Sequence, residues 1–239
     1  NNGAPAEPVV DYAFAQHDVN LATALIVTHN VDPKIIMDKS VPASGSINLN
    51  MAKVALQNGA APDPYFNNAV ATNNMQLADI LLVNGGSSNK LLEESINANN
   101  VRFATHAFDK GAQASANGNL FLKCVENDNS EMTRLFIDRG GNVGDTRLVK
   151  TAVTNNNLEI ASMLIDNGAP VTDRNLIQTA VDKSNTEMAR LLLTNGAPAT
   201  DPKLIKSAVD QSNIEITTLL ISSGATVADP NLIQAAVSK

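Results

Sequence analysis

The chain has 239 residues, of which 44% are apolar but only 3% aromatic, and it carries a formal net charge of −7 at pH 7. This charge argues against a general nucleic-acid binder, because such a protein needs an excess of Lys and Arg to displace counterions from phosphates. The single cysteine excludes an internal disulfide framework and a cysteine-rich zinc site, and the apolar runs are shorter than the roughly 18 residues of a bilayer span, so we expect no membrane insertion.

A unit of 28 residues repeats along the sequence. Gly140, Gly168, Gly196 and Gly224 follow one another at this spacing, which continues towards the N-terminus with small changes in length. Self-similarity at such a period is typical of repeat proteins. The whole chain, 1–239, is therefore predicted to be one repeat domain, with units roughly at 6–30, 31–59, 60–85, 86–111, 112–140, 141–168, 169–196 and 197–224 and a partial unit at 225–239.

Each unit begins with a predicted short helix, which the segment 201–211 represents best. Asp201 is a suitable N-cap, and Pro202 fits the first turn, where its missing N–H costs no hydrogen bond. The same pair is expected to start helices at Asp32, Asp63 and Asp229. The apolar side chains recur at the spacing of one helical face, at Leu204, Ile205, Ala208 and Val209. The third residue of this stripe is small, which lets a neighbouring helix approach closely: Ala69, Ser95, Cys124, Ala152, Ala180, Ala208 and Ala236.

A second helix follows in every unit, as the segment 213–224 illustrates. Ile216, Leu219 and Leu220 form its apolar stripe, and Gly224 stands one residue past its end, where a left-handed backbone is needed. A strong N-cap residue precedes each of these helices: Asp18, Asn48, Asn74, Asn100, Asn129, Asn157, Asn185 and Asn213. A ladder of metal or anion ligands is the functional alternative for this column, but capping alone explains the choice of residue.

The two helices of a unit depend on stacking for their stability. Neither helix, at about ten residues, is stable alone in water, so each unit buries its apolar faces against the next unit. Four Asn-Gly pairs, which are typical of β-hairpins, follow residues with helical spacing, and we interpret them as helix ends: 58–59, 84–85, 167–168 and 195–196. The predicted fold is all-α, a solenoid of about eight helix pairs plus a terminal helix at 229–239.

The second unit is longer than the others. Gly59 follows Asp32 by 27 residues, whereas Gly224 follows Asp201 by 23. The extra residues fall at 41–46, which is interpreted as a tolerated loop insertion. A contact loop at one edge of the surface is the functional alternative.

His106 stands in the fourth unit where other units have Leu or Ile, and Phe103 and Phe108 flank it. A satisfied core histidine is the simpler interpretation, and a pH-sensitive weak point is the functional one. On the second interpretation, His106→Leu raises the melting temperature and flattens its pH dependence between about pH 5 and 7. Cys124 occupies the small-residue position of a first helix, so we expect it to be buried and not a reactive thiol.

The second helix and the residues after it resemble the ankyrin repeat, most closely in LEIASMLIDNGAP (158–170), TEMARLLLTNGAP (186–198) and IEITTLLISSGA (214–225). The resemblance covers the chain, is closest from residue 129 onward, and implies an ankyrin-like αα-repeat solenoid that binds other proteins. The T-P-L-H-x-A signature is missing, and the period is 28 residues where ankyrin repeats have about 33. We therefore expect short loops in place of the β-hairpin fingers of ankyrin repeats. A short αα-repeat of another family is the alternative.

The sequence contains no recognisable catalytic constellation. His17, His29 and His106 fall in different units, Cys124 has no histidine at helical spacing, and no nucleotide-binding, hydrolase or zinc-protease motif occurs. Capping explains most of the Asp and Glu residues. We therefore expect no enzyme activity, no cofactor and no metal.

A protein-binding module or scaffold is the function that the repeats favour, because solenoids present equivalent positions of successive units as one surface. The outward positions of the first helices are the candidates: Tyr12, Leu122, Lys123, Arg147, Lys150, Gln178, Thr179, Lys203, Lys206 and Ser207. Arg147, Lys150, Lys203 and Lys206 form a basic stretch that suits a partner with an acidic surface. A solvated face of mixed charge is the alternative, since Asp182 and Asp210 lie among these bases.

Two other functions are consistent with the sequence. The terminal helix exposes an apolar face of Leu232, Ile233 and Val237, through which copies of the chain would stack end to end. An effector secreted into a host cell is the second, and it rests on the ankyrin resemblance alone. One cysteine and no visible signal peptide favour a cytoplasmic location. Because the chain begins with Asn1, it is interpreted as a processed product or as part of a longer protein.

Overall fold

The structure is a computed structural model that describes residues 7–225. Over this range it contains sixteen α-helices and two short 3₁₀ turns, and the described residues form no strand. The helices belong to two compact bodies, Asn1–Ala112 and Gln113–Lys239, which are considered separately below. The prediction of one repeat domain over 1–239 stays a prediction.

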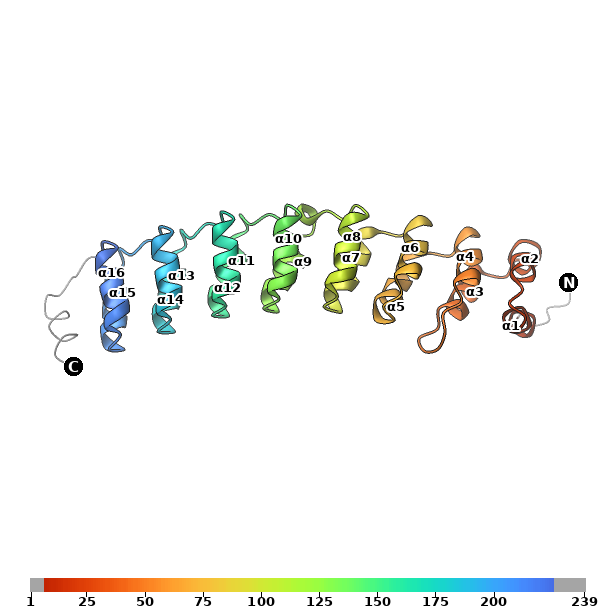
Figure 1. Ribbon diagram of the computed structural model, residues 1–239, viewed down its shortest axis with the longest axis horizontal. Helices are drawn as coiled ribbons and strands as arrows, with labels where there is room; N and C mark the ends of the chain where they lie inside the picture. The colour runs from red at the N-terminus through yellow and green to blue at the C-terminus, as the bar shows by residue number, and fades with distance from the viewer. Residues whose placement is uncertain (1–6, 226–239) are drawn as a thin grey trace. The chain divides into compact units, whose positions relative to one another are not determined.

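The N-terminal body holds four helix pairs that follow one another in chain order (Figure 1). The 3₁₀ turn η1 (Asp63–Tyr65) introduces the third pair. The pairs are α1 (Glu7–Ala15) with α2 (Val19–His29), α3 (Pro33–Ser40) with α4 (Leu49–Gln57), α5 (Phe66–Ala71) with α6 (Met75–Val83), and α7 (Ser88–Asn97) with α8 (Val101–Asp109).

The C-terminal body holds four more pairs, and the 3₁₀ turn η2 (Ala114–Ala116) precedes the first (Figure 1). These pairs are α9 (Gly118–Glu126) with α10 (Ser130–Asp138), α11 (Thr146–Thr154) with α12 (Leu158–Asp166), α13 (Arg174–Asp182) with α14 (Thr186–Thr194), and α15 (Pro202–Asp210) with α16 (Ile214–Ser222). The eight predicted helix pairs are therefore present. The predicted ninth helix at 229–239, with its apolar face, lies outside the described residues.

Within the C-terminal body, the first helices of successive repeats contact one another in one row, and the second helices contact one another in another row. The apolar core lies between the two rows. In α15 the predicted stripe of Leu204, Ile205, Ala208 and Val209 is buried, as is Cys124 at the equivalent small-residue position of α9. Both bodies have a mainly aliphatic core, in which the fully buried aromatic rings are Phe66, Phe103, Phe121 and Phe136.

The predicted N-caps are confirmed in all eight second helices. Each side-chain oxygen accepts a hydrogen bond from the backbone N–H three residues further on, from Asp18 at α2 to Asn213 at α16. The helices also end as predicted, because the glycine that follows each of them has a positive φ. In the first repeat Asn30 takes this left-handed position with a φ of 53°. The Asn-Gly pairs are therefore helix ends and not hairpin turns.

A second left-handed residue lies between the two helices of almost every pair, and the sequence analysis missed it. It directly precedes the cap residue, and none of its seven examples is glycine: His17, Asn73, Asn99, Asp128, Asn156, Ser184 and Ser212. Twice in the C-terminal body the cap of the following repeat donates to this residue. Asn157 Nδ2 lies 3.1 Å from Asp128 Oδ1, and Asn185 Nδ2 lies 2.6 Å from Asn156 Oδ1. Asparagine suits the cap because its side chain both accepts and donates.

Two local predictions were wrong. Asp63 does not cap a helix, because it lies inside the turn η1, and its carboxylate accepts from the backbone N–H of Ser87 at 2.7 Å. In α16 the buried side chains are Ile216, Thr217 and Leu220, whereas Leu219 is only half-buried. The equivalent three positions are also buried in α12 and α14, so this face is a property of the repeat.

The long second repeat differs from the others between its two helices. Here residues 41–48 form a longer connection in place of the tight left-handed turn, and the chain returns where the Asn48 N–H donates to the Ser40 carbonyl at 2.9 Å. The insertion at 41–46 is thus a loop, as predicted. Its role as a contact loop stays a prediction.

Candidate functional site

Six of the seven residues predicted to bind a partner lie on the first helices of the C-terminal body. Leu122 is on α9, Arg147 and Lys150 are on α11, Gln178 is on α13, and Lys203 and Lys206 are on α15. We call the outward side chains of these four helices the first-helix face. The seventh residue, Tyr12, is 60% exposed on α1 and belongs to the N-terminal body, so this face does not include it.

The two rows of helices in the C-terminal body carry opposite net charges. The first helices have a net charge of +3, from six bases and three acids: Lys123, Arg147, Lys150, Arg174, Lys203 and Lys206, against Glu126, Asp182 and Asp210. The second helices have a net charge of −4, from two bases and six acids: Arg134 and Arg190, against Glu131, Asp138, Glu159, Asp166, Glu187 and Glu215. Within the helix bounds the first helices are therefore more basic than the second helices, although their N-caps Asp145, Asp173 and Asp201 offset this excess.

Two of the four bases in the predicted basic stretch already have acidic partners. Arg147 donates to Asp145, the N-cap of its own helix, at 2.6 Å, and this guanidinium holds the pKa of Asp145 below its usual range. Lys206 Nζ lies 2.5 Å from Asp210 Oδ2. The Lys206 pair is largely exposed and the Arg147 guanidinium is about half-exposed, so both pairs weaken the field of the first-helix face.

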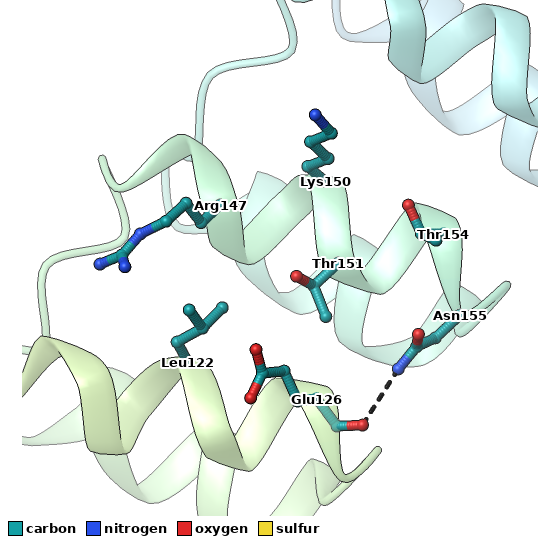
Figure 2. Close-up of a pocket in the computed structure, with 7 residues that line it drawn as sticks. All are labelled: Leu122, Glu126, Arg147, Lys150, Thr151, Thr154 and Asn155. Carbon is teal, nitrogen blue, oxygen red and sulfur yellow. Dashed lines mark hydrogen bonds between the residues drawn. The ribbon is translucent and has the colours of Figure 1, made fainter.

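A groove of about 340 Å³ runs between α9 and α11 on this face. It is lined by Leu122, Glu126, Arg147, Lys150, Thr151, Thr154 and Asn155. Figure 2 shows Leu122 and Glu126 rising from α9 towards Thr151 on α11, while Arg147 extends sideways at one end and Lys150 points away from α9. At one end Asn155 Nδ2 donates to the Glu126 carbonyl at 3.2 Å and holds the two repeats together.

The later first helices carry hydrogen-bonded pairs at the equivalent positions. In α13, Gln178 donates to Asp182 four residues further on at 2.6 Å. In α15, Lys206 pairs in the same way with Asp210. Ser207 Oγ also donates to Asp182 at 3.1 Å, so a direct hydrogen bond joins α13 to α15.

The groove lies where this pairing pattern is broken. In α9 the apolar Leu122 precedes Glu126, and in α11 Lys150 precedes Thr154. In α15 the acid and the base of such a pair belong to one helix, whereas here the acid, Glu126, is on α9 and the base, Lys150, is on α11. Leu122 is half-buried beside Glu126. The sequence analysis identified Leu122, Arg147 and Lys150 but missed the other lining residues. The sequence signal that identifies them is the absence, in α9 and α11, of the pair that Gln178 forms with Asp182 four residues further on in α13.

The two other singled-out residues are structural. Cys124 is buried, its thiol donates to the Leu120 carbonyl at 3.1 Å, and burial raises its pKa to about 12, as expected for an unreactive thiol. His106 is a satisfied histidine, as predicted, but it lies at the edge of the core and not inside it. Its half-buried ring places Nε2 2.9 Å from Asp79 Oδ1, and Lys110 Nζ approaches the same oxygen at 3.5 Å. The expected effect of His106→Leu on melting stays a prediction.

The described residues offer no group of three or more His, Cys, Asp or Glu side chains that is placed to hold a metal ion. None of the helices between residues 7 and 225 is long and apolar enough to cross a membrane.

Solved structures with this fold are ankyrin repeat domains. One from Acinetobacter baumannii AYE has a TM-score of 0.58 at 22% identity and covers 68% of this chain and 100% of that domain. The domain of Bcl-3, a member of the IkappaB protein family, gives 0.55 at 18% identity over 70% and 88%. That of human ASB11 gives 0.53 at 17% over 72% and 96%. The fold is therefore an all-α, ankyrin-like repeat solenoid.

No protein-family model and no curated protein matches the sequence.

Proposed function

We propose that this protein is a non-catalytic module that binds another protein through the first-helix face of its C-terminal body. The similarity to ankyrin repeat domains supports a repeat surface as the working part. The observation that carries the proposal is the charge difference between the two rows, +3 on the first helices and −4 on the second helices. A partner with an acidic surface is attracted to one row and repelled by the other.

The proposal is tested by capturing partners from cell extract and measuring how tightly the recovered protein binds. Lys203→Glu with Lys206→Glu reverses two exposed charges on the first-helix face and is expected to weaken capture strongly. Arg134→Glu with Arg190→Glu makes the same charge change on the second helices and serves as the matched control. Equal capture by the wild type and the Lys203/Lys206 variant contradicts the assignment of the first-helix face as the binding surface.

A further inference from the structure

We propose that the groove between α9 and α11 receives one aliphatic side chain of an acidic peptide segment. This inference rests on the proposed protein-binding function and assigns the point at which the partner is anchored. The occupant has two chemical properties, an aliphatic group and nearby carboxylates. Each property is argued from different residues of the groove.

The aliphatic group follows from Leu122. Its half-exposed side chain faces the groove at a position that Gln178 and Lys206 fill in later repeats. A volume of about 340 Å³ is at the lower end of the range of ligand pockets. It therefore suits one side chain with its adjoining backbone. An aliphatic group on Leu122 removes apolar surface of both partners from water.

The polar groups of the groove orient the backbone of such a segment. The Glu126 carboxylate lies beside Leu122 on α9, and Thr151 faces these two side chains from α11 (Figure 2). Glu126 has no donor at the position four residues earlier, unlike Asp182, which accepts from Gln178. A carboxylate only accepts, so Glu126 is suited to a backbone N–H of the bound segment, and Thr151 is suited to either a donor or an acceptor.

The acidic character follows from two bases that line the groove and from the whole face. These bases are Arg147 and Lys150, and Lys150 has no acid four residues further on, since Thr154 stands there. A carboxylate beside the aliphatic anchor is attracted to Lys150 and, more weakly, to Arg147, which is already paired with Asp145. The +3 charge of the first helices favours such a segment over a neutral or basic one.

The probe for this proposal is a displayed library of random 12-residue peptides, selected on the full chain. Enriched peptides are expected to share an aliphatic residue with Asp or Glu close to it. One of them, labelled with fluorescein, then reports affinity by fluorescence anisotropy. Replacing its aliphatic residue by Ala is expected to weaken binding at least tenfold.

Leu122→Gln is the decisive variant because it gives α9 the residue that α13 has at this position, where Gln178 bonds to the acid four residues on. This variant is expected to retain the fold and to bind the selected peptide at least tenfold more weakly. Replacing the aliphatic residue of the peptide by Ala is then expected to cause little further loss of affinity. Leu158→Gln makes the same change at an exposed leucine of α12, on the second helices, and is the matched control that leaves the affinity within about twofold. Lys150→Gln is expected to weaken binding and to reduce its dependence on salt.

Three results overturn the groove assignment: no enriched peptide, enriched peptides that are basic or lack an aliphatic residue, or equal affinity for the wild type and Leu122→Gln. These failures are distinguishable from failure of the proposed function. If Lys203→Glu with Lys206→Glu abolishes capture of a natural partner and Leu122→Gln does not change it, the face binds protein but the groove is not its anchor. If the lysine variant changes nothing, the proposed function itself fails.

Discussion

Gly141→Ala is expected to destabilise the C-terminal body because a β-carbon has no room at this position. It would lie 2.8 Å from the Phe136 carbonyl oxygen and 3.1 Å from two ring atoms of Phe121. The φ of Gly141 is not positive, so space and not backbone conformation requires the glycine. Gly86 follows the same rule, because its β-carbon would lie 2.7 Å from the ring of Phe66.

Other repeats combine these two positions differently. Ala169 and Ala197 occupy the position of Gly141, and the first helices before them carry Val149 and Ile177 where α9 carries Phe121. The repeat with the large ring of Phe121 therefore has glycine at 141, whereas the repeats with a smaller aliphatic side chain have alanine at the equivalent position. This exchange predicts that Phe121→Ile relieves the damage caused by Gly141→Ala.

The expected magnitudes follow from packing. Overpacking a core costs about 1–3 kcal/mol, and replacing glycine by alanine recovers about 0.4–1 kcal/mol through the unfolded chain, so Gly141→Ala loses about 1–2 kcal/mol in net terms. Phe121→Ile loses the stacking on Phe136, whose ring centroid is 5.0 Å away, worth about 0.5–1.5 kcal/mol, and some buried volume. The double variant is expected to be more stable than the sum of the two losses by about 1 kcal/mol or more.

Urea unfolding followed by circular dichroism measures all four members of this double-mutant cycle. A second probe checks that the transitions coincide, because repeat proteins can unfold in steps. Gly118→Ala is the control, since its β-carbon meets nothing within 4 Å. If the two losses add to within about 0.5 kcal/mol, the reasoning about the ring and the glycine is refuted.

Three further changes test other parts of the account. Asn157→Asp keeps the N-cap but removes the donor to Asp128, so unfolding free energy is expected to fall by about 1 kcal/mol, and Asp128→Asn restores it; an unchanged urea midpoint contradicts the cross-repeat bond. Ser212→Gly, at a φ of 57°, is expected to gain about 0.5–1 kcal/mol, whereas Ser223→Gly, at −89°, gains nothing. The Cys124 thiol, with its pKa raised to about 12, is expected to react with a thiol probe at neutral pH only as the fold opens; rapid labelling of the folded chain overturns this.

The periodic features could be predicted from sequence because they are local. A cap residue contacts a backbone N–H three residues away, and a helix-ending glycine acts through its own φ, so Asn213 and Gly224 are recognisable wherever they recur. The residue between the paired helices was missed because its type varies. Ser184 and Asp128 adopt the same left-handed conformation, although neither resembles the glycine usually expected there.

The contacts between repeats could not be predicted in the same way. His106 meets Asp79 across 27 positions in the chain, and only the stacking register selects that partner. Helical spacing places the candidate residues at exposed or half-buried positions of the first helices, but their role in binding stays a prediction. The groove depends on Leu122 and Glu126, which form no pair within α9. The combination of Phe121 with Gly141 could have been recognised in the sequence, because a Gly-Gly pair at 140–141 stands where later repeats have Gly-Ala. The sequence analysis overlooked it.

Site-specific photo-crosslinking tests the central claim most directly, that the first-helix face of the C-terminal body binds a protein. A photoreactive side chain is placed in turn at Gln178 and Lys203 on the first helices and at Arg134 and Arg190 on the second helices, and each chain is irradiated with its captured partner. The account predicts crosslinks from the first pair and none from the second. Crosslinks of equal yield from both rows, or from the second helices alone, would contradict it.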